Sequence, residues 1–227
     1  MLVTVLANLE EIRSTIKRAC DKVNRNEEDI TVIGVTKYVT IKRTEEAIEA
    51  GINHLGENRL EGLLEKFTSI EDRANWHFIG SLQSRKVRDL IDKVDYIHSL
   101  DRKSLAKEIN KRANRTIPCF VQVNVSGEES KHGLNLEDVP DFIDQLKNFS
   151  NIKVVGLMTM APHVENEQLL RNTFKELRLM RDKINKQGLE HAPCSYLSMG
   201  MSNDYAIAIE EGATHVRIGS KLVGSND

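Results

Sequence analysis

The sequence predicts an α/β protein folded as a single (β/α)₈ barrel, in which eight parallel strands close into a ring surrounded by helices. Three observations favour this class. Short apolar runs alternate with amphipathic stretches along the 227 residues, which is the pattern of a parallel sheet. The runs begin ~26 residues apart on average, close to the roughly 30 residues of one βαβ unit. No linker or change of composition divides the chain, so we expect one domain, residues 1–227, that begins with a helix.

Eight short runs are the expected strands of this barrel. They are 31–36, 53–58, 75–81, 95–100, 118–125, 153–160, 195–200 and 214–219. Residues 1–20 have a short apolar start and early acidic residues, which predicts a helix rather than a signal peptide. Stretches 41–51 and 165–188 carry apolar residues three and four positions apart and end at Gly51 and Gly188, which predicts helices. The alternative, a doubly wound open sheet, predicts a G-x-G-x-x-G turn after the first strand, and the sequence has none there.

Composition narrows the classes of function. A net charge of -2 gives no positive field for nucleic acid, and the sequence lacks a run of about 18 apolar residues that would predict a membrane span. The three cysteines, Cys20, Cys119 and Cys194, are far apart and predict buried thiols in a reducing cytoplasm rather than a disulfide framework. The histidines show no H-x-x-H or H-E-x-x-H spacing, so we expect no metal site. We therefore expect a cytoplasmic protein that binds neither nucleic acid nor membrane.

The C-terminal ends of the strands are the expected site, because barrels of this class carry their active sites there. The first run ends directly before Lys37, and the last ends at Gly219 and Ser220. A Gly-Ser step can turn backbone N–H groups toward a phosphate, and barrels often bind phosphate after strands seven and eight. The commoner role of such glycines is simply to form tight turns.

Lys37 also has two interpretations. A lysine after a strand is most often a solvated cation whose stem lies on apolar surface. The functional alternative is a partly buried, uncharged amine that attacks an aldehyde. An aldehyde for the lysine and a phosphate for the glycine loop occur together in pyridoxal 5′-phosphate (PLP), with Arg217 between them near the pyridine ring. The sequence therefore favours PLP as the cofactor.

Several long segments resemble the pyridoxal phosphate homeostasis protein family. They are VTKYV, HLGENRLEGLLEK, WHFIGSLQSRKV, VQVNVSGEESKHGL, GLMTM and LSMGMSNDYAIAIEEGATHVRIGSKLVG, in the family's order from about Ile33 to Gly224. That family is similar to the barrel domain of alanine racemase, a fold-type III PLP enzyme, and lacks its second, β-rich domain. The chain departs from many members at KYVTI, which has no proline, and at Arg85, where they carry asparagine. Both departures concern loop conformation.

The resemblance implies a set of residues that bind PLP. They are Lys37, Asn58, Ser198, Met199, Arg217, Gly219 and Ser220. By this resemblance the lysine holds PLP as a Schiff base and the arginine faces the pyridine nitrogen. The segments at 198–199 and 219–220 face the phosphate, and the asparagine lies near the cofactor.

The same resemblance implies a carrier rather than an enzyme. An arginine at the pyridine nitrogen keeps that nitrogen unprotonated, so the cofactor is a weaker electron sink. Racemisation needs an acid or base on each face of the substrate, and the enzymes resembled take the second group from another domain or subunit. We expect a monomer that buffers PLP and delivers it to unidentified PLP-dependent apoenzymes, with little or no turnover. Two alternatives stay open: a low-activity amino-acid racemase, with Tyr38 or Tyr205 as candidate second groups, and a barrel that binds another phosphorylated ligand.

Other features have structural interpretations. His77 lies inside an apolar run and is expected to be a hydrogen-bonded core histidine, and Trp76 is expected to pack in the core. The basic stretch 84–89 predicts a solvated helix face, which we favour over an anion or partner site. The charged segment 126–138 is either a mobile lid beside the cofactor or an exposed loop.

Overall fold

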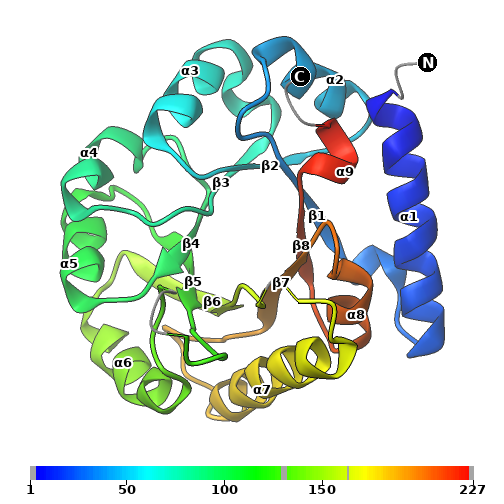
Figure 1. Cartoon of the computed structure of the whole chain (residues 1–227). Helices are drawn as coiled ribbons and strands as arrows, with labels where there is room; N and C mark the ends of the chain where they lie inside the picture. The colour runs from blue at the N-terminus through cyan, green and yellow to red at the C-terminus, as the bar shows by residue number, and fades with distance from the viewer. Residues whose placement is uncertain (1–3, 129–131, 163, 225–227) are drawn as a thin grey trace.

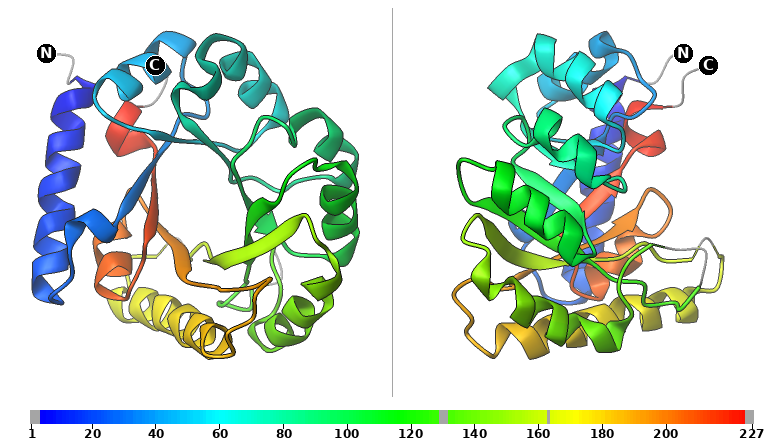
Figure 2. Two further views of the ribbon diagram at one scale, coloured as in Figure 1. Left: turned by 180° about the vertical axis from the view of Figure 1, so that it is seen from behind. Right: turned by 90° about the vertical axis from the view of Figure 1, so that its left-hand side faces the viewer.

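A closed barrel is the core of the fold. The computed structural model describes residues 4–128, 132–162 and 164–224. Within them, eight parallel strands pair in sequence order and close when β8 pairs with β1, which confirms the predicted fold class. Figure 1 shows the strands as an inner ring with helices outside it, and the side view in Figure 2 shows the helices stacked around the ring.

The strands lie where the apolar runs predict them. They are β1 Thr31–Val35, β2 His54–Glu57, β3 Asn75–Phe78, β4 Tyr96–Leu100, β5 Ile117–Gln122, β6 Ile152–Met158, β7 Tyr196–Met201 and β8 His215–Ile218. Most end one to three residues before the predicted run does. The residues beyond these points leave the sheet for the loops that form the C-terminal face.

The helices cover the outside of the ring. They are α1 Val5–Lys22, α2 Ile41–Glu49, α3 Leu60–Ile70, α4 Val87–Leu90, α5 Lys103–Arg112, α6 Val139–Gln145, α7 Glu167–Asn185, α8 Tyr205–Glu210 and α9 Ser220–Val223. The three helices that the sequence predicts correspond to α1, α2 and α7, although residues 1–3 of the first prediction lie outside the described residues. α1 packs against α8 and the C-terminal α9 and lies beside β1 in Figure 1.

Side-chain caps and positive-φ glycines set the helix boundaries. The Thr40 hydroxyl accepts a hydrogen bond from the Arg43 N–H at 3.2 Å and begins α2, and the Asn166 side chain caps α7 in the same way. Gly51 and Gly188 follow α2 and α7 with φ of 101° and 61°, a backbone conformation that glycine adopts without steric cost. The Thr40 cap therefore begins α2 directly after the short loop that follows β1 and contains Lys37.

The sheet separates two buried regions. Side chains that point outward, such as Leu55, Trp76 and Leu197, are fully buried beneath the helices, as expected for Trp76. The lumen is more polar: it holds His77, His98 and other buried polar side chains. The three cysteines are also buried, as the sequence predicts.

The two charged segments differ in how they are held. In the basic stretch 84–89, Lys86 pairs with Glu61 at 2.7 Å on the surface, and Arg88 is exposed, which confirms a solvated helical face. In the segment 126–138, residues 129–131 lie outside the described residues. Its flanks are tied to β5, because Gln122 Nε2 donates to the His132 carbonyl at 3.1 Å. No helix in the described part of the chain is both long and apolar enough to cross a bilayer.

Candidate functional site

A cavity opens where β1 and β8 end side by side. It has a volume of about 380 Å³ and is lined by Val35, Lys37, Tyr38, Val39, Gly219, Ser220 and Gly224. Its size lies in the range of small-molecule sites, roughly 300–1,000 Å³. The fold thus brings Lys37 together with Gly219 and Ser220, which are about 180 residues away in sequence. This face is the one on which (β/α)₈ barrels carry their sites.

Lys37 lies exposed at the rim of this cavity. The sequence interpretation required partial burial of its amine, and that requirement is wrong for this structure. The amine stands 5.5 Å from the centre of the Tyr38 ring, within reach of a cation–π contact. Tyr38 itself has a φ of 71°, a strained conformation for a residue with a side chain. Such strain clusters at functional sites, where the surrounding structure holds it.

A buried ion pair supports the backbone beneath Lys37. Lys66 Nζ donates to Glu57 Oε1 and to the Thr36 carbonyl, both at 2.7 Å, and the Thr36 hydroxyl also donates to Glu57 Oε1 at 2.7 Å. The Lys66 and Glu57 side chains are only 5% and 2% exposed. Because the Thr36 carbonyl belongs to the peptide that joins it to Lys37, this network fixes the base of the lysine.

The loops after β7 and β8 meet at Ser202. The Ser202 hydroxyl accepts the Gly219 N–H at 3.3 Å and lies 3.4 Å from the Ser220 hydroxyl. Ser202 is half-buried, and Ser220 is exposed at the cavity. Ser202 was absent from the expected site residues, although it lies in the same LSMGMS motif. The pairing of the two loops is a tertiary feature that sequence spacing alone does not show.

Ser198 and Met199 belong to the segment that the resemblance places at the phosphate, and that placement stays a prediction. The structure shows where their side chains lie. Ser198 is fully buried, and its hydroxyl accepts from Arg217 Nη1 at 2.6 Å and lies 2.9 Å from His98 Nδ1. Met199 is also fully buried, but it packs in the hydrophobic core, because alternate residues of a strand point to opposite faces. Neither side chain lines the cavity at Lys37.

Arg217 occupies the lumen one layer beneath the cavity. It is 5% exposed and lies in β8, two residues before Gly219, which follows the strand and lines the cavity. Besides Ser198, it donates to the Thr159 carbonyl at 2.9 Å. Burial lowers the pKa of Arg217 to about 10, so the guanidinium remains protonated at neutral pH.

Asn58 follows β2 and is half-buried. Its carbonyl lies 2.1 Å from the position that a Cβ on Gly80 would occupy, so the two backbones meet closely and only glycine fits at 80. Asn58 does not line the cavity at Lys37. Its expected place near the cofactor stays a prediction.

Comparison with known proteins places this geometry in a family. Residues 7–227 match the family model described as "Alanine racemase, N-terminal domain". The pyridoxal phosphate homeostasis protein of Aquifex aeolicus is 41% identical over 220 residues, which cover 95% of this chain and 96% of that protein. The protein of the same name from Pseudomonas aeruginosa is 34% identical and covers 99% of this chain and 96% of its own.

A solved structure extends the likeness to three dimensions. PipY of Synechococcus elongatus with PLP bound superimposes with a TM-score of 0.81 and is 29% identical, covering 92% of this chain and all of PipY. Nearly the whole chain is covered by the family model, and also by the sequence matches to the Aquifex and Pseudomonas proteins. The chain therefore belongs to the pyridoxal phosphate homeostasis protein family, whose barrel is that of the alanine racemase N-terminal domain.

Proposed function

We propose that this chain, acting as a single PLP-binding barrel domain, holds PLP on Lys37 and serves to buffer the cofactor and deliver it to PLP-dependent apoenzymes. The observation that carries the proposal is the shared cavity, which is lined both by Lys37 and by the Gly219–Ser220 loop. Membership of the family and the PLP bound to PipY support the choice of ligand.

The residues present fit PLP. The cofactor supplies an aldehyde and a phosphate, and the cavity is lined by an amine and by a loop of small residues. The space around Gly219 is not crowded. A Cβ placed there would have Val35 as its nearest neighbour, at an ordinary contact distance of 3.4 Å. Arg217 has five N–H donors, of which Ser198 and the Thr159 carbonyl take two, so it retains donors for an acceptor on the ring.

The exposure of Lys37 favours storage over turnover. Attack of the amine nitrogen on the aldehyde carbon forms a C=N bond, and the aldehyde oxygen leaves as water with both amine protons. Because Lys37 is exposed, water reaches the C=N bond and can reverse this step. Hydrolysis of that bond releases PLP. Arg217 acts on the ring side: it donates hydrogen bonds and gives up no proton, which keeps the ring a weak electron sink.

A second candidate, a slow amino-acid racemase, rests on Tyr38. Its ring lines the same cavity and lies 5.5 Å from the Lys37 amine, so a phenol stands near the reacting group. The carrier proposal predicts that this phenol moves no proton to or from a substrate, and that the protein works as a monomer.

Reductive trapping tests the proposal. Borohydride treatment of the PLP-loaded protein should leave a pyridoxyl group on the peptide that contains Lys37. Lys37→Ala should abolish the label and the visible absorption, whereas Lys42→Ala, which removes an exposed lysine from nearby α2, should change neither. Labelling of a different lysine, or of none, contradicts the proposal. Exchange of L- and D-amino acids at enzyme-like rates that depends on Lys37 favours the racemase instead.

A further inference from the structure

A continuous line of side-chain hydrogen bonds crosses the barrel lumen. His54 Nδ1 lies 2.9 Å from His77 Nε2, His77 Nδ1 lies 2.9 Å from His98 Nε2, and His98 Nδ1 lies 2.9 Å from the Ser198 hydroxyl. Arg217 Nη1 closes the line on Ser198 at 2.6 Å. We call these five residues the lumen relay. It joins β2, β3, β4, β7 and β8, and confirms the expectation that His77 is a hydrogen-bonded core histidine.

The relay has a defined direction. Arg217 can only donate, so the Ser198 oxygen accepts a hydrogen bond from it, and the Ser198 hydroxyl hydrogen is directed at His98 Nδ1. A neutral imidazole has one donor and one acceptor nitrogen, so His98 donates through Nε2 to His77, and His77 donates through Nε2 to His54. Each donor then finds an acceptor. In the reverse direction, both Arg217 Nη1 and His98 Nδ1 would donate to the Ser198 oxygen, and the Ser198 hydroxyl hydrogen would have no acceptor within the relay.

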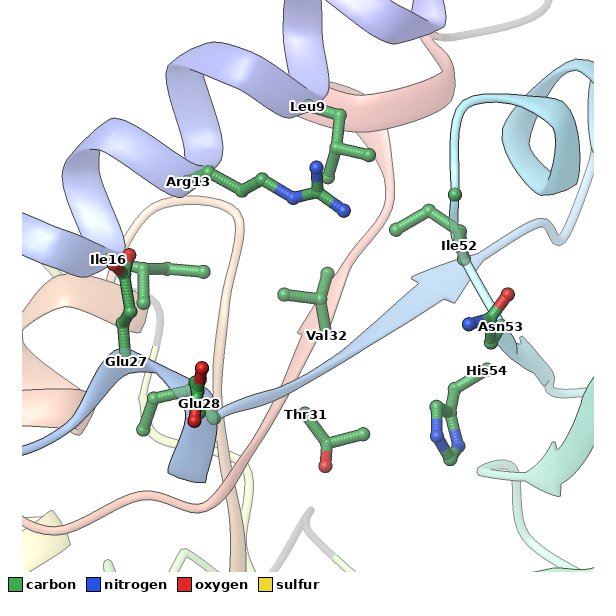
Figure 3. Close-up of a pocket in the computed structure, with 12 residues that line it drawn as sticks. Leu9, Arg13, Ile16, Glu27, Glu28, Thr31, Val32, Ile52, Asn53 and His54 are labelled. Carbon is green, nitrogen blue, oxygen red and sulfur yellow. The ribbon is translucent and has the colours of Figure 1, made fainter.

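Burial keeps the inner histidines neutral, as this direction requires. Both His77 and His98 are fully buried, and desolvation lowers the pKa of each well below the ordinary value. His54 is half-buried and lines a second cavity of about 560 Å³ between α1 and the starts of β1 and β2 (Figure 3). In Figure 3 its ring lies beside Asn53 at the edge of this cavity. The relay therefore runs from the N-terminal end of β2, beside this second cavity, to Arg217.

The hydrogen-bond dipoles of Ser198 and the three histidines are all oriented so that they stabilise the positive charge on Arg217. Lone pairs point toward the guanidinium and N–H bonds point away from it, and its other acceptor is the Thr159 carbonyl, also an uncharged oxygen. A buried charge is costly unless its hydrogen bonds are satisfied. An ordinary neutral serine would leave its hydroxyl free to rotate, but His98 fixes it with the lone pair toward Arg217.

We propose that Ser198, His98, His77 and His54 are positioning residues, which orient the guanidinium of Arg217 from behind so that its remaining N–H groups face PLP. This inference rests on the proposed function, because it assigns the relay to the ring side of the same cofactor. None of the three histidines lines the Lys37 cavity, so each acts only through the next member of the relay.

Replacing one ring in the middle of the relay tests this assignment. His77→Phe removes both nitrogens and retains an aromatic ring to stack on Tyr96, which lies parallel to His77 at 4.5 Å. The matched control is His215→Phe: His215 is buried in the same aromatic cluster, 6.4 Å from His77, but its Nδ1 contacts Thr214 outside the relay. A role in packing alone predicts similar effects for both.

The readouts are PLP affinity and the absorption maximum of bound PLP. We expect His77→Phe to weaken binding about fivefold, the order of one ordinary hydrogen bond between uncharged groups, and to shift the maximum. The control should change affinity by less than about twofold and leave the maximum in place. Equal behaviour of the two variants overturns the relay. Failure of the wild-type protein to bind PLP at Lys37 would instead contradict the proposed function, so the two failures are distinguishable.

A measurement on the PLP-free wild-type protein needs no variant to fold. Long-range ¹H–¹⁵N spectra of ¹⁵N-histidine protein report which ring nitrogen carries the proton. At pH 7 we expect both His77 and His98 to be neutral and protonated at Nε2. Protonation at Nδ1 in either residue, or an imidazolium, overturns the proposed direction. Should His77→Phe fail to fold, Ser198→Ala cuts the same line by removing a single oxygen, with the same spectral shift expected.

Discussion

The buried pair beneath Lys37 allows a quantitative test of how the site is supported. Lys66→Met removes the ammonium and leaves the Glu57 carboxylate, 2% exposed, with the Thr36 hydroxyl as its remaining side-chain donor among the described residues. Breaking a buried ion pair from one side costs about 3–5 kcal/mol. A natural domain has a free energy of unfolding of roughly 5–15 kcal/mol, so this loss is a large share of it. We expect the urea midpoint to fall by roughly 1–2 M.

Urea unfolding followed by circular dichroism measures this loss, and two further variants sharpen it. Lys66→Met combined with Glu57→Gln removes the unpaired charge and should recover at least half of the lost stability. Lys147→Met removes an exposed partner of Asp144 and should change stability by less than about 0.5 kcal/mol, since surface pairs contribute little. A loss below about 1 kcal/mol for Lys66→Met, or a double variant as unstable as the sum of the single ones, would refute the reasoning.

Three other outcomes follow from the same contacts. Gly219→Val should weaken PLP binding far more than it lowers the melting temperature, because its Cβ meets Val35 at an ordinary 3.4 Å while its methyl groups enter the cavity; equal PLP affinity contradicts this placement. Gly200→Ala should lower the free energy of unfolding by more than about 2 kcal/mol, because Gly200 has a φ of 92° and a Cβ there would lie 2.6 Å from that of Ala208; a neutral effect in urea unfolding refutes it. Burial lowers the pKa of His215 to about 3, so below about pH 6.5 the unfolded state binds a proton that the folded state does not. The free energy of unfolding should therefore fall as pH drops from 6.5 toward 3, by up to about 1.4 kcal/mol per pH unit from this residue, and His215→Phe should flatten the fall.

The sequence was sufficient for the architecture because each strand and helix carries its own local signal. The apolar runs gave all eight strands to within a few residues, and Gly51 and Gly188 marked helix ends. Closure of the ring then placed Lys37 beside Gly219, since both follow strands that are neighbours only in a closed barrel. The juxtaposition of lysine and glycine loop was therefore predictable from strand counting alone.

The relay depended on register, which no local pattern specifies. His54, His77 and His98 lie 23 and 21 residues apart, about one βα unit each, so a periodic search at that spacing could have found them. Their contact with Ser198, 100 residues further along, requires the opposite wall of the barrel. Register also decides the side chains of the segment 198–199, which is expected to face the phosphate: strand alternation directs Ser198 to Arg217 and Met199 to the core.

The contrast between two lysines explains how an exposed amine can still be a defined site. Lys66 shares the buried face of α3 with Leu63 and Ile70, three and four positions away, so helical periodicity contained a signal that it points inward. Inside, it neutralises Glu57 and holds the Thr36 carbonyl, while the Thr40 cap begins α2 on the other side of Lys37. The backbone of Lys37 is therefore fixed at both ends although its side chain is solvated. A carrier needs this combination, because a fixed base places the amine beside the Gly219 loop and a solvated tip lets water release the ligand.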